Sequence, residues 1–379
     1  MRLAAQRREL ILAAVRAHGV VRLADLVDRL GVTAVTVRRD VTALAERGLV
    51  SRVHGGITVP HHGDPPSSPR WAHTLVGMVA PSEDYYWPAV IQGAQAAVTA
   101  AGGRLALHTS CYDAAEDRRQ VAKLLERGVQ ALLVAPSTTG AAGIDLLHWL
   151  SGLSAPVVLI ERMPPAELPT IGLDAAVTDH ALGAGLAVRH LAALGHRTVG
   201  LVLSHLSPHR AAIRDGWSAA LSSLDLSSGG VPALDVPPYG LPGWAEACDD
   251  VLARCVRAGV RALLVHADRE AIALLERARD RGLDVPGDLA VVSYDDEVAA
   301  ASDPPLTAVR PQKHRLGALA AQLALARVAD PLDRPVHRVT LWPSLTVRES
   351  CGTPRDRSGR PVGTGRNRLS AEPAPSSSP

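Results

Sequence analysis

Polar and aromatic residues that could bind a small molecule follow several apolar runs of the chain. They are Asp84, Tyr85, Tyr86 and Trp87 after the first run, Glu161 after the fourth, and His266, Asp268 and Asp295 after later ones. Carboxylates accept hydrogen bonds from hydroxyl groups, and aromatic rings cover the apolar faces of sugar rings. This combination predicts a site for a polyhydroxylated ligand.

The apolar runs themselves predict strands of parallel sheets, because short β-branched runs alternate with helical patterns. In such folds ligands bind beyond the carboxyl ends of the strands, where these polar residues lie. The seven predicted strands cover residues 74–79, 105–108, 131–134, 157–160, 199–203, 262–265 and 290–293. The predicted fold class of this part of the chain is α/β with parallel sheets.

One internal repeat indicates two similar lobes. The sequence Gly-Val-Gln-Ala-Leu-Leu-Val at 128–134 returns as Gly-Val-Arg-Ala-Leu-Leu-Val at 259–265, each time after a predicted helix. A ligand site between two such lobes would receive residues from both.

A second group of residues could bind a polyanion. Residues 1–60 contain ten arginines, no lysine and five acidic residues, a net charge of +5, whereas the whole chain carries +2. A basic segment attached to a mildly acidic remainder favours contact with nucleic acid.

Two short helices are predicted within this basic segment. Leu23, Leu26, Val27 and Leu30 recur at helical spacing before the stop at Gly31. Thr33 can cap a second helix with the buried stripe Ala34, Val37, Val41 and Leu44. The second helix of such a pair can enter the major groove of double-stranded DNA. The residues predicted to contact DNA from it are Thr33, Val35, Thr36, Arg38, Arg39 and Thr42.

A hairpin is predicted after Gly48, with strands at 49–54 and 57–59 around Gly55 and Gly56. It would place Arg52 and His54 beside the DNA backbone, as a wing. The alternative for the two helix arginines is a solvated charge pair with no partner.

Residues 5–60 resemble the DeoR-type winged helix. The resemblance rests on Thr36-Val37-Arg38-Arg39-Asp40 together with Arg52-Val53-His54-Gly55-Gly56. It implies a transcription regulator that binds an operator, and regulators of this type bind as oligomers, so we expect a homodimer.

The remainder, from Thr74 to about Glu349, resembles the effector-binding domain of the LacI/GalR repressors. The matching strings are Gly195-His196-Arg197, the 282–288 segment that leads into Tyr294-Asp295-Asp296, and the 303–310 segment. The resemblance implies a two-lobed fold similar to periplasmic sugar-binding proteins, with effector contacts from Asp295 and from residues 84–87. We expect the chain to cross between the lobes near Leu173, Asp296 and Arg327.

Several candidates have a structural alternative. Ala267-Asp268 stands where that family has Asn-Asp, so His266 could substitute for the amide or be a buried structural histidine. Arg214 stands two residues before Gly216-Trp217 where the family's ligand arginine stands three before, with Ile213 in the expected place.

Three other candidates are open in the same way. The aromatic residues at 85–87 could be core or dimer contacts, Glu161 could simply pair with Arg162, and Asp295 could be a helix cap or a turn former.

Composition divides the chain into four parts. Residues 1–60 form the predicted winged helix-turn-helix, 61–72 a Pro-rich linker, 73–350 the two-lobed domain, and 351–379 a disordered tail. Pro65, Pro66 and Pro69 disfavour a helix in the linker.

Other function classes find little support. No apolar run is long enough to span a membrane and no secretory signal begins the chain, so we expect a cytoplasmic protein. The four cysteines have no zinc-ligand spacing, and we expect no metal and no cofactor. The alternative function is a sugar- or nucleoside-processing enzyme with a DNA-binding head, but no catalytic motif supports it.

Overall fold

The computed structural model describes residues 4–46, 49–53, 56–58, 74–165, 167–168, 171–231, 233–330 and 334–352. The chain divides into two compact units, residues 1–70 and 71–379, and each is described by itself. The predicted linker at 61–72 and residues 353–379 of the tail predicted at 351–379 lie outside the described residues. The predicted start of the tail is wrong, because Cys351 is buried in a core cluster of the second unit.

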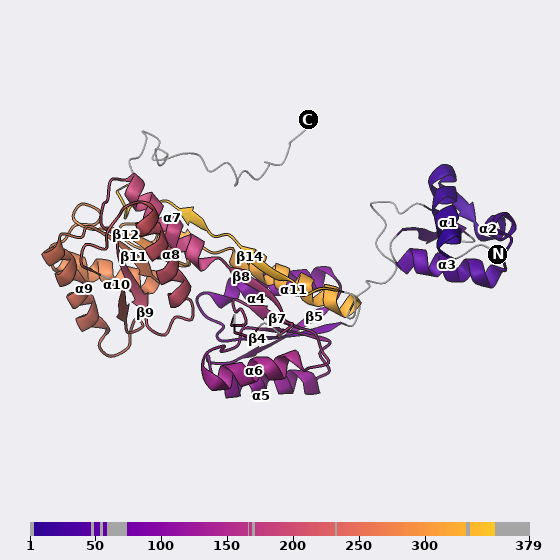
Figure 1. The fold of residues 1–379 in the computed structure, drawn as a ribbon, viewed down its shortest axis with the longest axis horizontal. Helices are drawn as coiled ribbons and strands as arrows, with labels where there is room; N and C mark the ends of the chain where they lie inside the picture. Colours follow the sequence, from indigo (N-terminus) through magenta and orange to yellow (C-terminus); the bar gives the residue numbers. More distant parts are fainter. Residues whose placement is uncertain are drawn as a thin grey trace. The chain divides into compact units, whose positions relative to one another are not determined.

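The first unit contains three helices and a small antiparallel sheet among its described residues (Figure 1). Helix α2 ends at Gly31, whose φ of 63° allows its N–H to reach the Val27 carbonyl at 3.0 Å. Thr33 caps α3 as predicted, because its Oγ1 accepts from the Thr36 N–H at 3.4 Å. The elements are α1 (Ala4–His18), β1 (Val20–Arg22), α2 (Leu23–Leu30), α3 (Ala34–Glu46), β2 (Ser51–Val53) and β3 (Gly56–Thr58).

The core of this unit lies along one face of α3. Val37, Val41 and Leu44 are buried as predicted, but the prediction for Ala34 is wrong, because this first residue of the helix is exposed. Asp40 is also buried, and its carboxylate pairs with Arg7 at 2.8 Å and Arg8 at 3.0 Å. An ion pair thus fixes α1 against α3.

The hairpin predicted after Gly48 is present, with its first strand beginning at Ser51 instead of Leu49 and its second at Gly56 instead of Ile57. Strands β2 and β3 pair antiparallel from Ser51 with Thr58 to Val53 with Gly56. Strand β1 joins on the other side of β3, so the sheet order is β1-β3-β2. The sequence pattern missed β1 because a three-residue strand shows no alternation.

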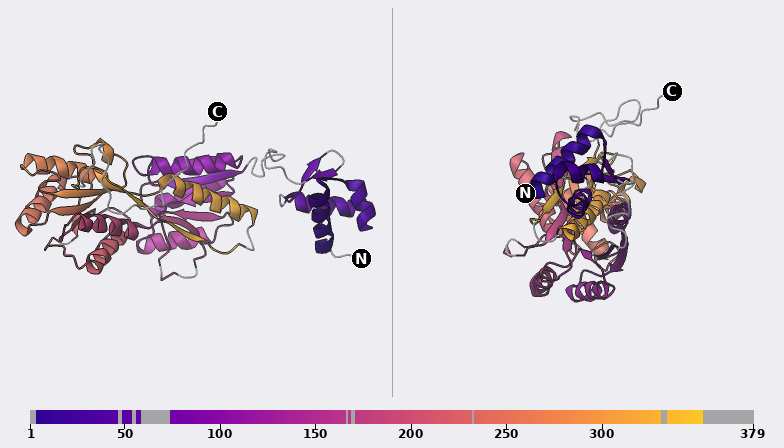
Figure 2. Two further views of the ribbon diagram at one scale, coloured as in Figure 1. Left: turned by 90° about the horizontal axis from the view of Figure 1, so that it is seen from above. Right: turned by 90° about the vertical axis from the view of Figure 1, so that its right-hand side faces the viewer.

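The second unit consists of two lobes, each with a six-stranded sheet (Figures 1 and 2). Their sheet orders are β5-β4-β6-β7-β8-β14 and β10-β9-β11-β12-β13-β15, so the corresponding strands follow one another in the same way. The first lobe contains β4 (Leu75–Ala80), α4 (Trp87–Ala100), β5 (Arg104–Thr109), α5 (Ala114–Glu126), β6 (Ala131–Val134), α6 (Gly140–Ser151), β7 (Val157–Ile160), β8 (Asp174–Thr178), α11 (Lys313–Ala329) and β14 (Arg338–Leu341).

The second lobe repeats this plan. The repeated heptapeptide supplies β6 in one lobe and β11 in the other, which confirms the interpretation of that repeat. The elements of the second lobe are α7 (His180–Ala193), β9 (Gly200–Ser204), α8 (Arg210–Ser223), β10 (Leu234–Val236), α9 (Trp244–Ala258), β11 (Ala262–His266), α10 (Asp268–Asp280), β12 (Ala290–Tyr294), η1 (Ala299–Ala301), β13 (Thr307–Arg310) and β15 (Ser344–Thr346).

Helices cover both faces of each sheet. In the first lobe α4 and α11 pack on one face and α5 and α6 on the other; in the second, α9 and α10 lie opposite α7 and α8 (Figure 1). All strands are parallel except β15, which pairs antiparallel with β13. The predicted two-lobed parallel α/β class is therefore confirmed.

The chain crosses between the lobes at three places, and the predicted places are wrong. The crossings follow β8 (178–180), β13 (310–313) and β14 (341–344). Leu173 lies in the core of the first lobe, Asp296 follows a strand of the second, and Arg327 pairs with Asp174 inside the first lobe at 2.8 Å. No helix within the described ranges is both long and apolar enough to cross a membrane.

Helices α4 and α11 approach each other closely through two glycines. A Cβ at Gly317 would lie 1.9 Å from the Val90 carbonyl oxygen, and one at Gly93 would lie 1.9 Å from the His314 carbonyl oxygen. Backbone atoms cannot rotate out of the way as side chains can, so only glycine allows this approach.

We expect Gly317→Ala to lower the free energy of unfolding by about 1–3 kcal/mol, because the helices must separate. Gly185→Ala is the matched control: this helical glycine has open space around its Cβ position, and alanine there should add about 0.5–1 kcal/mol of stability. Denaturant unfolding measures both variants. Equal stability of Gly317→Ala and the wild type would contradict the close-packing interpretation.

Candidate DNA-binding face and effector pocket

The outer face of α3 presents arginines that no described acid neutralises. Arg38 and Arg39 are exposed and form no ion pair with the described residues, whereas the next residue, Asp40, turns inward to Arg7 and Arg8. The sequence Arg-Arg-Asp is thus divided between the surface and the core. Two free guanidinium groups remain available for phosphates or guanine edges.

Further predicted DNA contacts lie on or beside the same helix. Val35 is 74% exposed, so its side chain is available to an apolar partner such as a thymine methyl group. Thr33 and Thr36 share a 3.0 Å hydrogen bond at the helix start, and Thr42 donates to the Arg38 carbonyl. The backbone of Arg52 lies in β2, and His54 lies outside the described residues.

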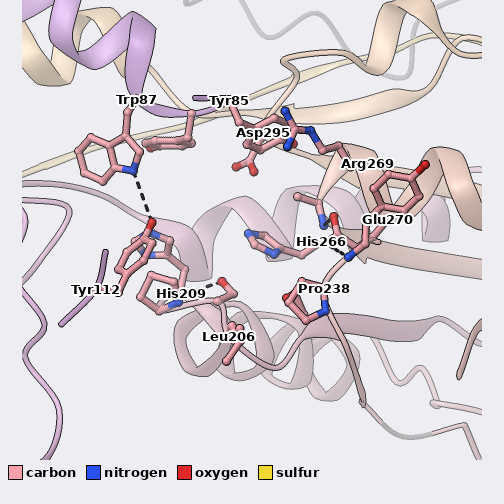
Figure 3. Close-up of a pocket in the computed structure, with 16 residues that line it drawn as sticks. Tyr85, Trp87, Tyr112, Leu206, His209, Pro238, His266, Arg269, Glu270 and Asp295 are labelled. Atoms are coloured by element: carbon pink, nitrogen blue, oxygen red, sulfur yellow. Dashed lines mark hydrogen bonds between the residues drawn. The ribbon is translucent and has the colours of Figure 1, made fainter. Parts of the chain in front are cut away.

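The second unit contains a cavity of about 360 Å³ at the carboxyl ends of strands from both lobes (Figure 3). Trp87 and Tyr112 lie at one end, Arg269 and Glu270 at the other, and His266 lies between them. It is lined by Tyr85, Tyr86, Trp87, Tyr112, Ser204, Leu206, Ser207, Pro208, His209, Pro238, Tyr239, His266, Ala267, Arg269, Glu270 and Asp295.

Tyr85 connects the lobes across this cavity. It belongs to the first lobe, but its hydroxyl accepts from the Asp268 N–H at 3.1 Å and lies near the Asp295 carboxyl, both in the second lobe. The Arg269 guanidinium lies 4.9 Å from its ring centre. These are the kinds of contact that a ligand hydroxyl and a sugar ring would make in the same place.

The ionisable groups of the cavity are tuned by burial. Burial raises the pKa of Asp295 to about 7, although the Lys313 ammonium acts in the opposite direction. Burial disfavours the charged form of the histidines as well: it lowers the pKa of His266 to about 4 and holds the pKa of His209 well below its ordinary value. The cavity therefore presents neutral imidazoles, which can both donate and accept hydrogen bonds.

Glu161 supports the cavity wall from behind. Its carboxylate accepts from the Tyr86 hydroxyl, the Thr178 hydroxyl at 2.6 Å and the Thr178 N–H at 3.0 Å, and lies 3.4 Å from His180 Nε2. Burial alone would raise its pKa, but these hydrogen bonds, led by that of His180, hold the pKa at about 2. The alternative of a simple pair with Arg162 is wrong, because Arg162 donates to the Glu161 backbone carbonyl instead.

Glu161, His180 and His209 lie close enough to be considered as a metal site, with one possible ligand atom from each within 4.8 Å. The His180 and His209 rings are stacked, however, with centres 3.9 Å apart and planes 26° apart. An ion in the plane of one ring would lie well out of the plane of the other. Because four contacts also saturate the Glu161 carboxylate, this arrangement favours a hydrogen-bond network over metal coordination.

The structure brings five of the nine predicted effector residues to the cavity: Tyr85, Tyr86, Trp87, His266 and Asp295. The other four lie elsewhere. Asp84 is exposed at the turn before α4, Arg214 pairs with Asp235 at 2.8 Å, Glu161 lies behind Tyr86, and the Asp268 carboxylate accepts from Ser293, Glu297 and Val298.

Sequence reasoning missed several lining residues, most of them in loops. Tyr112 follows β5, His209 precedes α8, Tyr239 lies between β10 and α9, and Glu270 lies in the first turn of α10. A signal was available for these residues. The internal repeat aligns the strands of the two lobes, so the segments that follow corresponding strands could have been compared as candidate lining residues.

Backbone strain also collects at the cavity. Tyr85, Tyr112, Glu161 and Asp295 all have positive φ, between 55° and 94°, which L-residues rarely adopt. Such strain persists only where the surrounding structure imposes it, and it is typical of functional sites.

Three family models match the chain in order. Residues 7–62 match the DeoR-like helix-turn-helix domain. Residues 72–235 match the periplasmic binding proteins and sugar-binding domain of the LacI family, and residues 188–351 match a periplasmic binding protein-like domain.

Characterised relatives are similar over nearly their whole length. The HTH-type transcriptional regulator MalR of Streptomyces coelicolor is 28% identical over 90% of this chain and 99% of its own. The HTH-type transcriptional regulator GalR of Escherichia coli is 26% identical over 87% of this chain and 95% of its own.

A solved structure shares the fold. The transcriptional regulator CelR in complex with cellobiose superimposes with a TM-score of 0.62, at 23% identity, over 84% of this chain and 91% of the other. These relatives are regulators and not enzymes. The chain is therefore a transcriptional regulator similar to those of the LacI family, in which a periplasmic-binding-protein-like domain follows an N-terminal helix-turn-helix of DeoR-like type.

Proposed function

We propose that this regulator is a repressor whose operator affinity is controlled by a sugar bound in the cavity between its two lobes. The observation that carries the proposal is the cavity itself. Buried Asp295 and neutral His266 meet aromatic side chains there, at the carboxyl ends of the strands. Carboxylate, imidazole and aromatic planes together suit a neutral ligand with several hydroxyl groups.

Similarity supports the same proposal. The solved relative CelR binds cellobiose, and its fold matches that of this chain. The cavity contains no phosphate-binding glycine loop, and its arginine, Arg269, already lies over Tyr85. A neutral sugar therefore fits the cavity better than a sugar phosphate does.

The DNA-binding residues are proposed to be those on the outer face of α3. Arg38 and Arg39 would contact bases or phosphates, with Val35, Thr36 and Thr42 beside them and Arg52 and His54 on the wing. The support is the exposure of Val35, Arg38 and Arg39, and that no acid among the described residues neutralises the two α3 arginines. We further propose that the protein acts in the cytoplasm.

We expect Arg38→Ala and Arg39→Ala each to weaken operator binding by about 1–3 kcal/mol if the side chain reads a base. Arg257→Ala, which removes an exposed arginine from α9 of the second unit, is the control and should bind like the wild type. Fluorescence anisotropy at several salt concentrations, on a duplex selected by the wild-type protein, measures the change. Wild-type affinity in the double variant would rule out α3 as the recognition helix.

We expect Asp295→Asn to abolish the effect of the sugar on DNA binding, because the amide cannot replace a charged acceptor. The same variant should stabilise the sugar-free protein at pH 8. The folded-state pKa of Asp295, about 7, lies above its ordinary value of 3.8, so wild-type stability falls as the pH rises between these values.

Thermal unfolding at pH 5 and pH 8 tests this second effect. The variant's advantage in melting temperature should be larger at pH 8. Asp250→Asn, at an exposed position on α9, should show no such pH dependence. An advantage of equal size at both pH values would contradict the buried, ionisable role of Asp295.

We also propose a homodimer, because a single winged helix contacts too few bases to select one operator. The selected DNA should then contain two half-sites, and analytical ultracentrifugation at micromolar concentration should give twice the chain mass. A monomer both with and without DNA would exclude this arrangement.

A further inference from the structure

The cavity has an enclosed part, lined by buried residues, and extends beyond it to residues that are half exposed. Trp87, Asp295 and His266 are at most 8% exposed, but Tyr112 is 47% and Tyr239 is 52% exposed although both line the cavity. Folding ordinarily buries aromatic rings of this size, so two half-exposed tyrosines on one ligand cavity require an explanation.

The two tyrosines lie at opposite ends. The Tyr112 hydroxyl accepts a hydrogen bond from the Trp87 indole N–H at 3.4 Å, and Tyr112 therefore lies at the Trp87 end of the cavity in Figure 3. The backbone N–H of Tyr239 donates to the Glu270 carboxylate at 3.2 Å, which places it at the Glu270 end. One tyrosine belongs to each lobe.

Both rings are held in position. Tyr112 has a φ of 60°, its hydroxyl accepts from Trp87, and the buried Arg162 guanidinium lies 5.6 Å from its ring centre. Tyr239 packs edge-on against Trp244, with ring centres 6.2 Å apart. A side chain fixed in this way, on a strained backbone in one case, keeps its free face ready for a ligand.

We propose that the effector is an oligosaccharide of at least two sugar rings, which extends along the cavity from the enclosed Asp295 site toward the mouth and packs a ring against Tyr239. Exposed Leu206 adds apolar surface to the lining of the same cavity. This inference rests on the proposed sugar effector and adds the size of the sugar. A single ring would leave the fixed faces of the end tyrosines in water.

The test is isothermal titration of the full-length protein with D-glucose, D-galactose, D-xylose and D-mannose, and with maltose, cellobiose, lactose, xylobiose and maltotriose. We expect a disaccharide or trisaccharide to bind at least tenfold more tightly than its constituent monosaccharides. Tyr239→Ala should weaken binding of that oligosaccharide about five- to thirtyfold, and should weaken monosaccharide binding less.

Two further variants separate a ring contact from a loss of folding. Tyr239→Phe keeps the ring and should retain most of the affinity. Leu241→Ala removes a neighbouring exposed side chain that does not line the cavity and should bind like the wild type.

The experiment distinguishes a failure of the oligosaccharide inference from a failure of the proposed sugar effector. A monosaccharide that binds as tightly as every oligosaccharide, or equal losses for both in Tyr239→Ala, would overturn this inference and leave the sugar effector standing. Adenosine and guanosine are titrated in the same way, and tighter binding of either than of any sugar would overturn the proposed sugar effector together with this inference.

Discussion

The buried carboxylate of Glu161 is the interaction on which the effector pocket depends. Glu161 directly follows β7 in the first lobe, and its carboxylate fixes Tyr86 in the cavity wall and lies 3.4 Å from His180 at the first crossing between the lobes. His180 in turn lies 3.3 Å from the Tyr294 hydroxyl, which belongs to β12 of the second lobe. An uncompensated charge there would be costly, so the polar network holds both strand ends and the crossing in one arrangement.

Much of the fold could be predicted because its signals are local. The seven strands were evident as apolar runs, and the repeated heptapeptide correctly indicated two equivalent lobes. The missed strands depend on distant partners. Strand β8 begins at Asp174, a residue that argues against a strand until its pair with Arg327 is seen, and β15 follows its β13 partner by more than thirty residues. The crossings were misplaced because they depend on these later strands.

The pocket could be predicted where its residues follow a predicted strand. Asp295, His266 and the aromatic residues at 85–87 are of this kind, and all of them line the cavity. Asp268 follows a strand too, but its carboxylate turns back to the Glu297 and Val298 N–H groups, which is a contact between the start of α10 and a loop that no spacing reveals. Arg214 faces Asp235 because α8 presents that side to β10. Tyr112, His209 and Tyr239 come from loops whose conformation is set by tertiary contacts.

The contact between Tyr85 and Asp295 suggests how a ligand can act on the lobes without any catalytic step. The Tyr85 hydroxyl lies near the buried Asp295 carboxyl and accepts from the Asp268 N–H at 3.1 Å. A sugar hydroxyl bound to Asp295, as proposed above, would compete with Tyr85 for the same oxygen atoms. Because Tyr85 belongs to one lobe and Asp295 to the other, this exchange replaces a direct contact between the lobes with a contact through the ligand. A ligand shifts a conformational equilibrium only by its difference in affinity for the two states, and this exchange supplies such a difference.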